Sequence, residues 1–389
     1  MAEFDVIVVG VGSMGSAVCY QLAKRGVRVL GLEQFDIPHG LGSAHGFSRM
    51  IRLAYYENPN YVALLKRGLD LWYQLEADSG EKLLYRTGGL YMGPMESELL
   101  SGSLRAAREH GLEHELLEHD DCARRFEQFH LPDNFVGFYE TDVGFLLPER
   151  VIAAHAIQAL HRGVQLRGRE PVVDWHADGT GVEVSTNQAK YTADRLVFCS
   201  GAWSAKLIKQ LAPSLTITRQ VQGWVWPRRP ELFQLGNFPC WAIDFNEPQF
   251  SRGLFYGFPM MNDNPGLKVA QHWPMKATDP DNVVRDPLPG DLDTFMPVLQ
   301  RVLPGAIPET SAVLALRTCL YTNSPDSHFI IDRHPDPRYR DRVIIACGFS
   351  GHGFKFASVI GEALADLAMH GKTDLPIDFL SMGRVISKQ

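Results

Sequence analysis

A glycine pattern near the start of the chain has the residue types and spacing of a dinucleotide-binding loop. Gly10, Gly12 and Gly15 follow directly after an apolar run at residues 6–9. In such a loop the first glycine allows a tight turn, the second lets the backbone approach a pyrophosphate, and the third lets helix and strand pack closely. Glu33 lies roughly 20 residues further on, where an acid accepts hydrogen bonds from a ribose. The chemistry that this pattern predicts is the binding of a dinucleotide.

The flanking segments predict the βαβ unit that such a loop requires. An unbroken apolar run is typical of a parallel strand that is buried on both faces. The helix that follows, up to Gly26, would point the free N–H groups of Ser13 and Met14 at the phosphates. Because Glu33 stands in place of an arginine, a 2′-phosphate, and therefore NADP, is not expected.

The far end of the chain repeats this order of elements. The apolar run 343–347 leads into a glycine-rich stretch at 348–353, and a helical pattern follows to His370. Another apolar strand ends at Gly201. A nicotinamide dehydrogenase normally completes its nucleotide fold within one continuous stretch, whereas this chain leaves the fold and returns to it twice. The pattern therefore favours FAD over NAD.

The intervening segments contain short aromatic and β-branched runs that are broken by prolines, as in a mainly antiparallel sheet. We therefore expect an α/β fold with a discontinuous, Rossmann-type FAD-binding domain made of residues 1–84, 146–218 and 319–389. An inserted α+β substrate domain, with a mainly antiparallel sheet, would comprise residues 85–145 and 219–318.

Composition narrows the class of partner. A net charge of -7 without a basic cluster disfavours nucleic acid and anionic membrane, so a small molecule is expected. The six cysteines are scattered and predict neither a disulfide framework nor a metal site. Without a long apolar run or a signal-peptide pattern, the expected location is the cytoplasm.

Ser350 suggests an esterase elbow, but His352 stands where GxSxG requires glycine, so a hydrolase is excluded.

Four stretches, taken together, resemble the monomeric sarcosine oxidase family, including N-methyltryptophan oxidase and pipecolate oxidase. They are residues 5–15, 42–52, 319–326 and 348–355, and the similarity covers nearly the whole chain in the same order. The resemblance implies a monomeric FAD-dependent oxidase of secondary amino acids, of the N-methyl or cyclic imino type. Such an enzyme oxidises the C–N bond to an imine and reduces O2 to H2O2.

The resemblance also implies how the cofactor is held. Cys319 matches the cysteine that carries FAD through a thioether, and a thiolate is a suitable soft nucleophile for that link. Arg49 matches an arginine that stacks against the flavin. The glycine loops and the resemblance together predict these cofactor-binding residues: Gly10, Gly12, Ser13, Met14, Gly15, Glu33, Ser43, His45, Arg49, Gly201, Cys319, Gly348, Gly351, His352, Gly353 and Lys355.

For the substrate, Arg52 and Lys355 match the pair that holds the carboxylate, and Tyr256 is expected to line the pocket. An arginine suits this role because its planar fork meets a carboxylate with two parallel hydrogen bonds. The expected catalytic residues are Lys268, which matches the oxygen-activating lysine, Arg49, His272 beside the substrate amine, Tyr321, and His352 near the flavin N1–C2 edge.

Some residues depart from the sarcosine-type pattern and leave the substrate open. Ala44, Phe47 and Ser48 are closer to the pipecolate-type run, and Leu53 stands where a histidine is common. Two alternatives to the oxidase also stay open: a flavin dehydrogenase that passes electrons to a protein or quinone, and a non-catalytic nucleotide-binding module.

Overall fold

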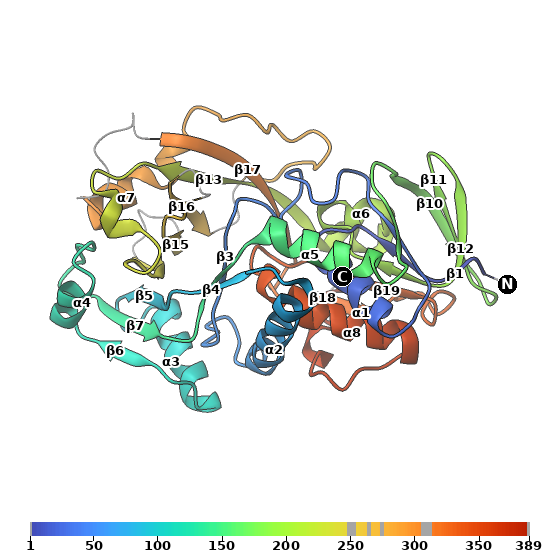
Figure 1. Cartoon of the computed structure of the whole chain (residues 1–389), viewed down its shortest axis with the longest axis horizontal. Helices are drawn as coiled ribbons and strands as arrows, with labels where there is room; N and C mark the ends of the chain where they lie inside the picture. Colours follow the sequence, from blue (N-terminus) through green and yellow to red (C-terminus); the bar gives the residue numbers. More distant parts are fainter. Residues whose placement is uncertain (1, 247–253, 263–265, 273–275, 305–312, 387–389) are drawn as a thin grey trace.

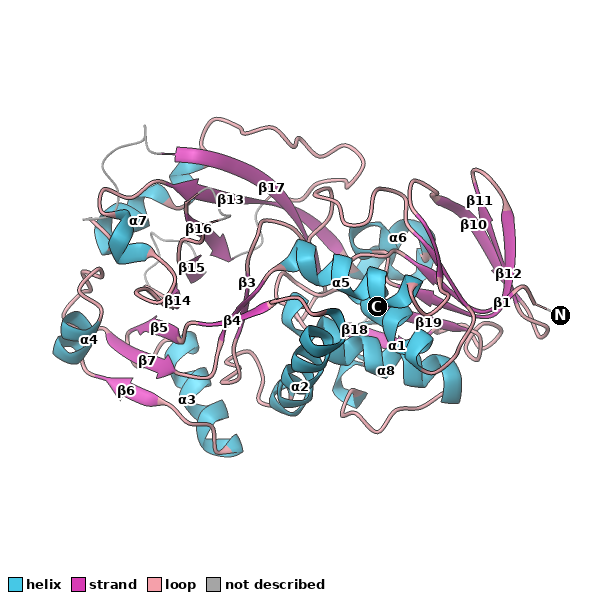
Figure 2. Ribbon diagram, in the orientation of Figure 1, coloured by secondary structure: helices cyan, strands magenta, loops and turns pink. Residues whose placement is uncertain are grey.

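Three β-sheets organise the chain in the computed structural model, which describes residues 2–246, 254–262, 266–272, 276–304 and 313–386. Two sheets have eight strands each and one has three. Figure 1 shows one large sheet, with helices α1, α5 and α8, at one end of the molecule and the other large sheet at the opposite end. The three-stranded sheet lies between them (Figure 2).

The first large sheet has a parallel core in the order β19-β12-β1-β2-β9. Ile7 and Val8 of β1 are fully buried, as the unbroken apolar run predicts. The parallel, nucleotide-binding type of sheet is thus confirmed. Its strands are β1 (Phe4–Val9), β2 (Val29–Leu32), β9 (Gln165–Arg167), β10 (Val172–Ala177), β11 (Val182–Thr186), β12 (Lys190–Phe198), β18 (Ile330–Arg333) and β19 (Val343–Cys347).

Helices from distant parts of the chain cover this sheet. α1 (Ser13–Lys24) packs against α5 (Pro148–Leu160) and α8 (Ala357–His370), and α8 also packs against α2 (Tyr61–Ser79). The contact of α1 with α8 is close because Gly361 has no side chain. A Cβ atom there would lie 2.6 Å from the Cβ of Ala17. Among the described residues, every helix is too short or too polar to cross a membrane.

The second large sheet has the order β17-β13-β16-β15-β14-β5-β7-β6, and its neighbours are antiparallel except for β14 and β5. This confirms an inserted, mainly antiparallel domain. Its strands are β5 (Gly89–Gly93), β6 (Glu115–Leu117), β7 (Val136–Glu140), β13 (Thr216–Val225), β14 (Cys240–Ile243), β15 (Leu254–Phe258), β16 (Leu267–His272) and β17 (Val313–Asn323). The other strands and α-helices of the described residues are β3 (Arg49–Ile51), β4 (Leu84–Arg86), β8 (Gly144–Leu146), α3 (Glu98–His110), α4 (His119–Arg125), α6 (Ser204–Leu207), α7 (Met296–Val302) and α9 (Gly383–Ile386).

The proposed domain boundaries all fall inside strands. Those after residues 84 and 145 lie in β4 and β8, which pair with each other. Those after residues 218 and 318 lie in β13 and β17, which also pair. The division into two domains remains a proposal, in which paired strands rather than loops join the two parts.

Gly361→Ala should lower the free energy of unfolding by about 1–3 kcal/mol, because the new methyl group overpacks the contact of α8 with α1. Gly68→Ala, inside α2, is the matched control. Its Cβ would meet side-chain atoms at 3.5 Å, an ordinary contact distance, so the helix should gain up to about 1 kcal/mol. Denaturant unfolding of both variants checks the difference, and equal stabilities would contradict the packing argument.

Candidate active site

The first glycine loop has the geometry of a phosphate-binding turn. Gly10 has a φ of +88°, and a Cβ there would lie 2.5 Å from the carbonyl oxygen of Cys199. A Cβ on Gly15 would lie 1.8 Å from the carbonyl oxygen of Gly10. A Cβ on Gly12, by contrast, would meet no described atom within 4 Å. The first and third glycines therefore permit close packing, while the second leaves open space beside the start of α1.

That open space belongs to a cavity of about 400 Å³, here called the first cavity. Residues from both ends of the chain line it. Nine of the predicted cofactor-binding residues are among them: Gly10, Gly12, Ser13, Met14, Glu33, Ser43, Gly201, Gly351 and Gly353. The strands and glycine loops that lie far apart in the sequence thus meet around one space.

Polar groups around the first cavity fit a dinucleotide such as FAD. Among the residues that the structure describes, no side chain caps the start of α1 at Gly12, so its first N–H groups are available to an anion. The Thr322 hydroxyl lines the cavity and is buried without a hydrogen-bond partner among the described residues. Glu33 also lines it, and its carboxylate accepts hydrogen bonds from the backbone N–H groups of Val11 (2.8 Å) and Phe35 (3.0 Å). The residues present therefore suit the group that the sequence predicts.

Of the other predicted cofactor residues, four line a second cavity described below, and three (Gly15, His45 and Gly348) line neither. Gly15 packs against Gly10, and Gly348 takes a left-handed turn with a φ of +64°. His45 is buried, and neither of its ring nitrogens has a partner within the described part of the chain. Burial, together with the nearby Arg49, lowers the pKa of His45 to about 3, so this ring is neutral.

A second cavity, of about 90 Å³, adjoins the first, and Tyr321, Gly351 and Phe354 line both. Its wall brings together most of the predicted substrate-binding and catalytic residues. Arg49, Arg52, Tyr256, His272, Cys319, Tyr321, His352 and Lys355 all line it.

Two cations, Arg52 and Lys355, form what we call the anion site. The Arg52 guanidinium pairs with Glu57 and lies 4.4 Å from the ring centroid of Tyr55. Its Nη1 atom is buried and has no hydrogen-bond partner among the described residues. Lys355 Nζ donates to the carbonyl oxygen of His352 at 2.8 Å. Burial, and then the charge of Arg52, lower the pKa of Lys355 to about 7. The arrangement leaves cationic donors available to a carboxylate.

The histidines of the second cavity are neutral. Burial, and next the neighbouring His352, lower the pKa of His272 to about 3, and its Nδ1 atom lies 3.0 Å from the Tyr321 hydroxyl. Burial and the charge of Lys355 hold the pKa of His352 well below its ordinary value. Both nitrogens of His352 contact protein groups, namely the Tyr55 hydroxyl and the carbonyl oxygen of Ser327. A positive charge near a flavin would therefore not come from this ring, and its catalytic role stays a prediction.

Cys319 lies where the two cavities meet. Its Sγ atom is 3.5 Å from the carbonyl oxygen of Ser43, a residue that lines the first cavity. Arg49 Nη2 lies 3.8 Å from the same sulfur and donates to the Ser43 carbonyl oxygen at 2.7 Å. The structure thus brings together a thiol, a fixed cation and the edge of the first cavity.

Lys268 lies beside the second cavity but does not line it. Its Nζ atom donates to the carbonyl oxygens of Gly46 and Ser48, both at 2.8 Å, and lies 4.9 Å from the ring centroid of Phe258, which does line the cavity. Burial and the charge of Arg49 hold the pKa of Lys268 well below its ordinary value. Its role in oxygen activation stays a prediction.

Sequence reasoning missed two residues that shape the site. The Tyr55 ring packs against the Arg52 guanidinium, and its hydroxyl forms a hydrogen bond with His352 Nδ1. Glu149, in the first turn of α5, accepts a hydrogen bond from the backbone N–H of Gly46 at 2.6 Å. The only local signal for Glu149 was its place in a first helical turn, and its partner lies a hundred residues away. In the described part of the chain, no group of three His, Cys, Asp or Glu residues could hold a metal ion.

Comparisons with known proteins agree with this geometry. Residues 5–367 match the family described as "DAO: FAD dependent oxidoreductase". The chain is 39% identical over 391 residues to the monomeric sarcosine oxidase of Streptomyces avermitilis, with 98% of each chain covered. It is 33% identical over 388 residues to the N-methyl-L-tryptophan oxidase of Escherichia coli, with 98% of this chain and 99% of that one covered.

A solved structure of similar fold is the open form of NikD, described as an unusual amino acid oxidase essential for nikkomycin biosynthesis. It superposes with a TM-score of 0.84 and 26% identity, covering 97% of both chains. The chain belongs to the DAO family of FAD-dependent oxidoreductases. The resemblance noted in the sequence, the Rossmann-type fold with its inserted domain, and FAD as the cofactor of the family are thereby confirmed.

The pKa of Lys355 predicts how anion binding depends on pH. Lys355 is protonated below about pH 7, and above that pH an incoming anion must bring a proton with it. The dissociation constant of acetate, a carboxylate without an amine, should therefore rise by up to about tenfold per pH unit above pH 7. Titration of the FAD-loaded protein, followed by flavin absorbance, measures it. Lys355→Met should bind acetate more weakly and with no such pH dependence. A dissociation constant of the unaltered protein that stays constant above pH 7 would contradict the role given to Lys355.

Proposed function

We propose that this protein is a FAD-dependent oxidase of secondary amino acids, with N-methyl amino acids as the first candidates and cyclic imino acids as the second. The amino acid is oxidised at its C–N bond to an imine, which water hydrolyses. Its two electrons and two protons convert O2 to H2O2. The observation that carries the proposal is the anion site, whose two cations line the second cavity, which adjoins the first cavity.

The anion site supports an amino acid as substrate. A carboxylate that accepts hydrogen bonds from Arg52 Nη1 and Lys355 Nζ would satisfy buried cationic donors, and charge-assisted bonds of this kind are strong. Holding the carboxylate also fixes where the amine and its adjacent C–H bond lie, and such positioning contributes several kcal/mol to catalysis. The relatives support the N-methyl class, because one is named a sarcosine oxidase and the other an N-methyl-L-tryptophan oxidase.

FAD, when bound, supplies the two-electron acceptor. Neutral His272 and the Tyr321 hydroxyl, which lie 3.0 Å apart in the second cavity, would contact the amine. Tyr256 would line the pocket wall. Arg49 and Lys268 would contribute fixed polar groups, which stabilise the negative charge that develops as O2 is reduced. We further propose that the protein is a monomer and cytoplasmic.

A substrate panel tests the proposed function. Sarcosine, N-methyltryptophan, pipecolate, proline and glycine are supplied to the FAD-loaded protein, and H2O2 formation and dye reduction are both measured. We expect H2O2 in amounts equal to the O2 consumed with at least one secondary amino acid, and little with glycine. Fast dye reduction with slow O2 consumption would instead identify a dehydrogenase. A flavin that no member of the panel bleaches would overturn the proposal.

We also propose that FAD is covalently attached through Cys319. Two of the six cysteines border the cavities. Cys199 is the other, and burial raises the pKa of its thiol, which disfavours the reactive thiolate. Cys319 instead lines the second cavity, with its Sγ atom 3.5 Å from the carbonyl oxygen of Ser43 and 3.8 Å from Arg49 Nη2.

Cys319→Ser should release all its flavin on acid precipitation, whereas the unaltered protein should keep it. Mass spectrometry of the peptide containing Cys319 should show the added mass of the flavin. Cys122→Ala, which changes a cysteine buried elsewhere in the inserted domain, is the control and should keep its flavin attached. An unmodified peptide from unaltered, yellow protein would refute the covalent link.

A further inference from the structure

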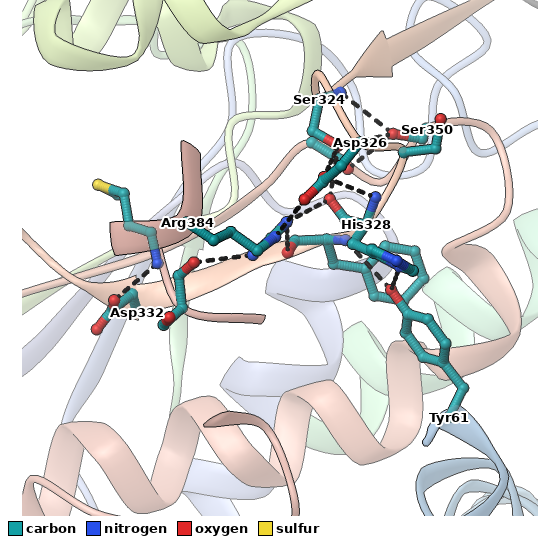
Figure 3. A network of polar contacts seen from close by, with 12 residues as sticks. Tyr61, Ser324, Asp326, His328, Asp332, Ser350 and Arg384 are labelled. Atoms are coloured by element: carbon teal, nitrogen blue, oxygen red, sulfur yellow. Dashed lines mark hydrogen bonds and ion pairs between the residues drawn. The ribbon is translucent and has the colours of Figure 1, made fainter. Parts of the chain in front are cut away.

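A turn at residues 324–329 is held by an arginine from the C-terminal helix α9. Arg384 Nε donates to Asp326 Oδ2 at 2.7 Å, and its Nη2 atom donates to the carbonyl oxygens of His328 (2.8 Å) and Phe329 (2.6 Å). Its Nη1 atom donates to the carbonyl oxygen of Ser381 at 2.8 Å. Figure 3 shows the guanidinium between the turn and the C-terminal segment. One side chain thus satisfies several acceptors of the turn.

The turn needs such support because its backbone is strained. Ser327 has a φ of +62°, a left-handed conformation that costs a non-glycine residue on the order of 1–3 kcal/mol. Side chains form hydrogen bonds with the backbone groups of the turn, which do not belong to a helix or strand. Ser324 Oγ donates to the carbonyl oxygen of His328 at 2.6 Å, and the backbone N–H of His328 donates to Asp326 Oδ1 at 3.1 Å. Arg384 and Asp326 thereby fix the conformation in which the Ser327 carbonyl is presented.

The Ser327 carbonyl in turn fixes the tautomer of His352. Its oxygen lies 2.9 Å from His352 Nε2, and a carbonyl oxygen can only accept a hydrogen bond, so Nε2 carries the proton. Because the ring is neutral, Nδ1 is bare and accepts a hydrogen bond from the Tyr55 hydroxyl. Ser327, His352 and Tyr55 therefore form one directed chain of hydrogen bonds.

This chain of hydrogen bonds ends at the anion site. The ring of Tyr55 lies under the Arg52 guanidinium at 4.4 Å, and it lies 5.2 Å from Lys355 Nζ. Lys355 Nζ also donates to the backbone carbonyl oxygen of His352. Both cations of the site thus rest on groups whose positions depend on His352 and Tyr55.

We propose that Arg384 is a positioning residue for the substrate carboxylate, acting through the turn at 324–329, His352 and Tyr55 on the anion site. Arg384 itself touches neither cavity, so its effect is on the geometry of the two cations. The inference rests on the proposed function in taking the carboxylate as the group that this site binds. Its consequence is that the C-terminal helix takes part in substrate binding.

Arg384→Ala tests the proposal in the FAD-loaded protein. We expect the dissociation constant of acetate, followed by flavin absorbance, and the KM for sarcosine to rise about tenfold, with a smaller fall in kcat, because the carboxylate interaction contributes to both binding and orientation. Millimolar guanidinium added to this variant should restore acetate binding. Asp326→Asn, which weakens the same contact from the turn, should shift both constants in the same direction and serves if Arg384→Ala does not fold.

Asp332→Ala is the matched control. Asp332 Oδ2 accepts a hydrogen bond from the backbone N–H of Met382 at 2.8 Å, so it also holds the C-terminal segment, but from outside the turn (Figure 3). It should lower the melting temperature and leave acetate binding unchanged. The proposal would be overturned if Arg384→Ala left the acetate dissociation constant and the KM for sarcosine unchanged. It would also be overturned if Asp332→Ala raised the acetate dissociation constant as much as Arg384→Ala does. If the unaltered protein binds acetate but oxidises no secondary amino acid, the proposed function fails while the acetate measurements still decide the role of Arg384.

Discussion

The pairing of β13 with β17 is the constraint on which the site depends. The two strands pair from Thr216 with Asn323 to Val225 with Val313, and they run through both proposed domains. Successive side chains of a strand point to opposite faces. Cys319 and Tyr321 accordingly line the second cavity, while Leu320 and Thr322 line the first. A single strand therefore forms the partition between the two spaces, and Tyr321 borders both at their junction.

The buried charges around the second cavity support the proposal that the site binds an anionic substrate. Arg52, Lys268 and Lys355 are buried, and burying a charge costs several kcal/mol unless partners offset that cost. Glu57 and Glu149 supply nearby carboxylates, but burial still holds the pKa values of Lys268 and Lys355 below their ordinary range. A substrate carboxylate, as proposed, would add negative charge beside these cations. The same interaction would then both bind and orient the substrate.

Local signals predicted the fold well. The apolar runs of β1 and β19 and the glycines after each of them identify strand, turn and helix from a few neighbouring residues. The resemblance assigned Arg52 and Lys355 to a carboxylate, and the structure places them in one cavity. It did not indicate that both nitrogens of His352 are occupied, because one partner, Tyr55, is 297 positions away in the sequence. Contacts of that range leave no trace in local periodicity.

The sequence by itself determined the main strands and helices around the two glycine loops, because these depend on backbone conformation and hydrophobic spacing over short stretches. The expected class of chemistry came from the resemblance to the sarcosine oxidase family. Only the tertiary structure decided which donors remain free at the anion site, which ring nitrogen of His352 carries the proton, and that Arg384 supports the turn behind it. These properties depend on burial and on contacts between distant segments. These contacts form only when the pairing of β13 with β17 brings the distant segments together around both cavities.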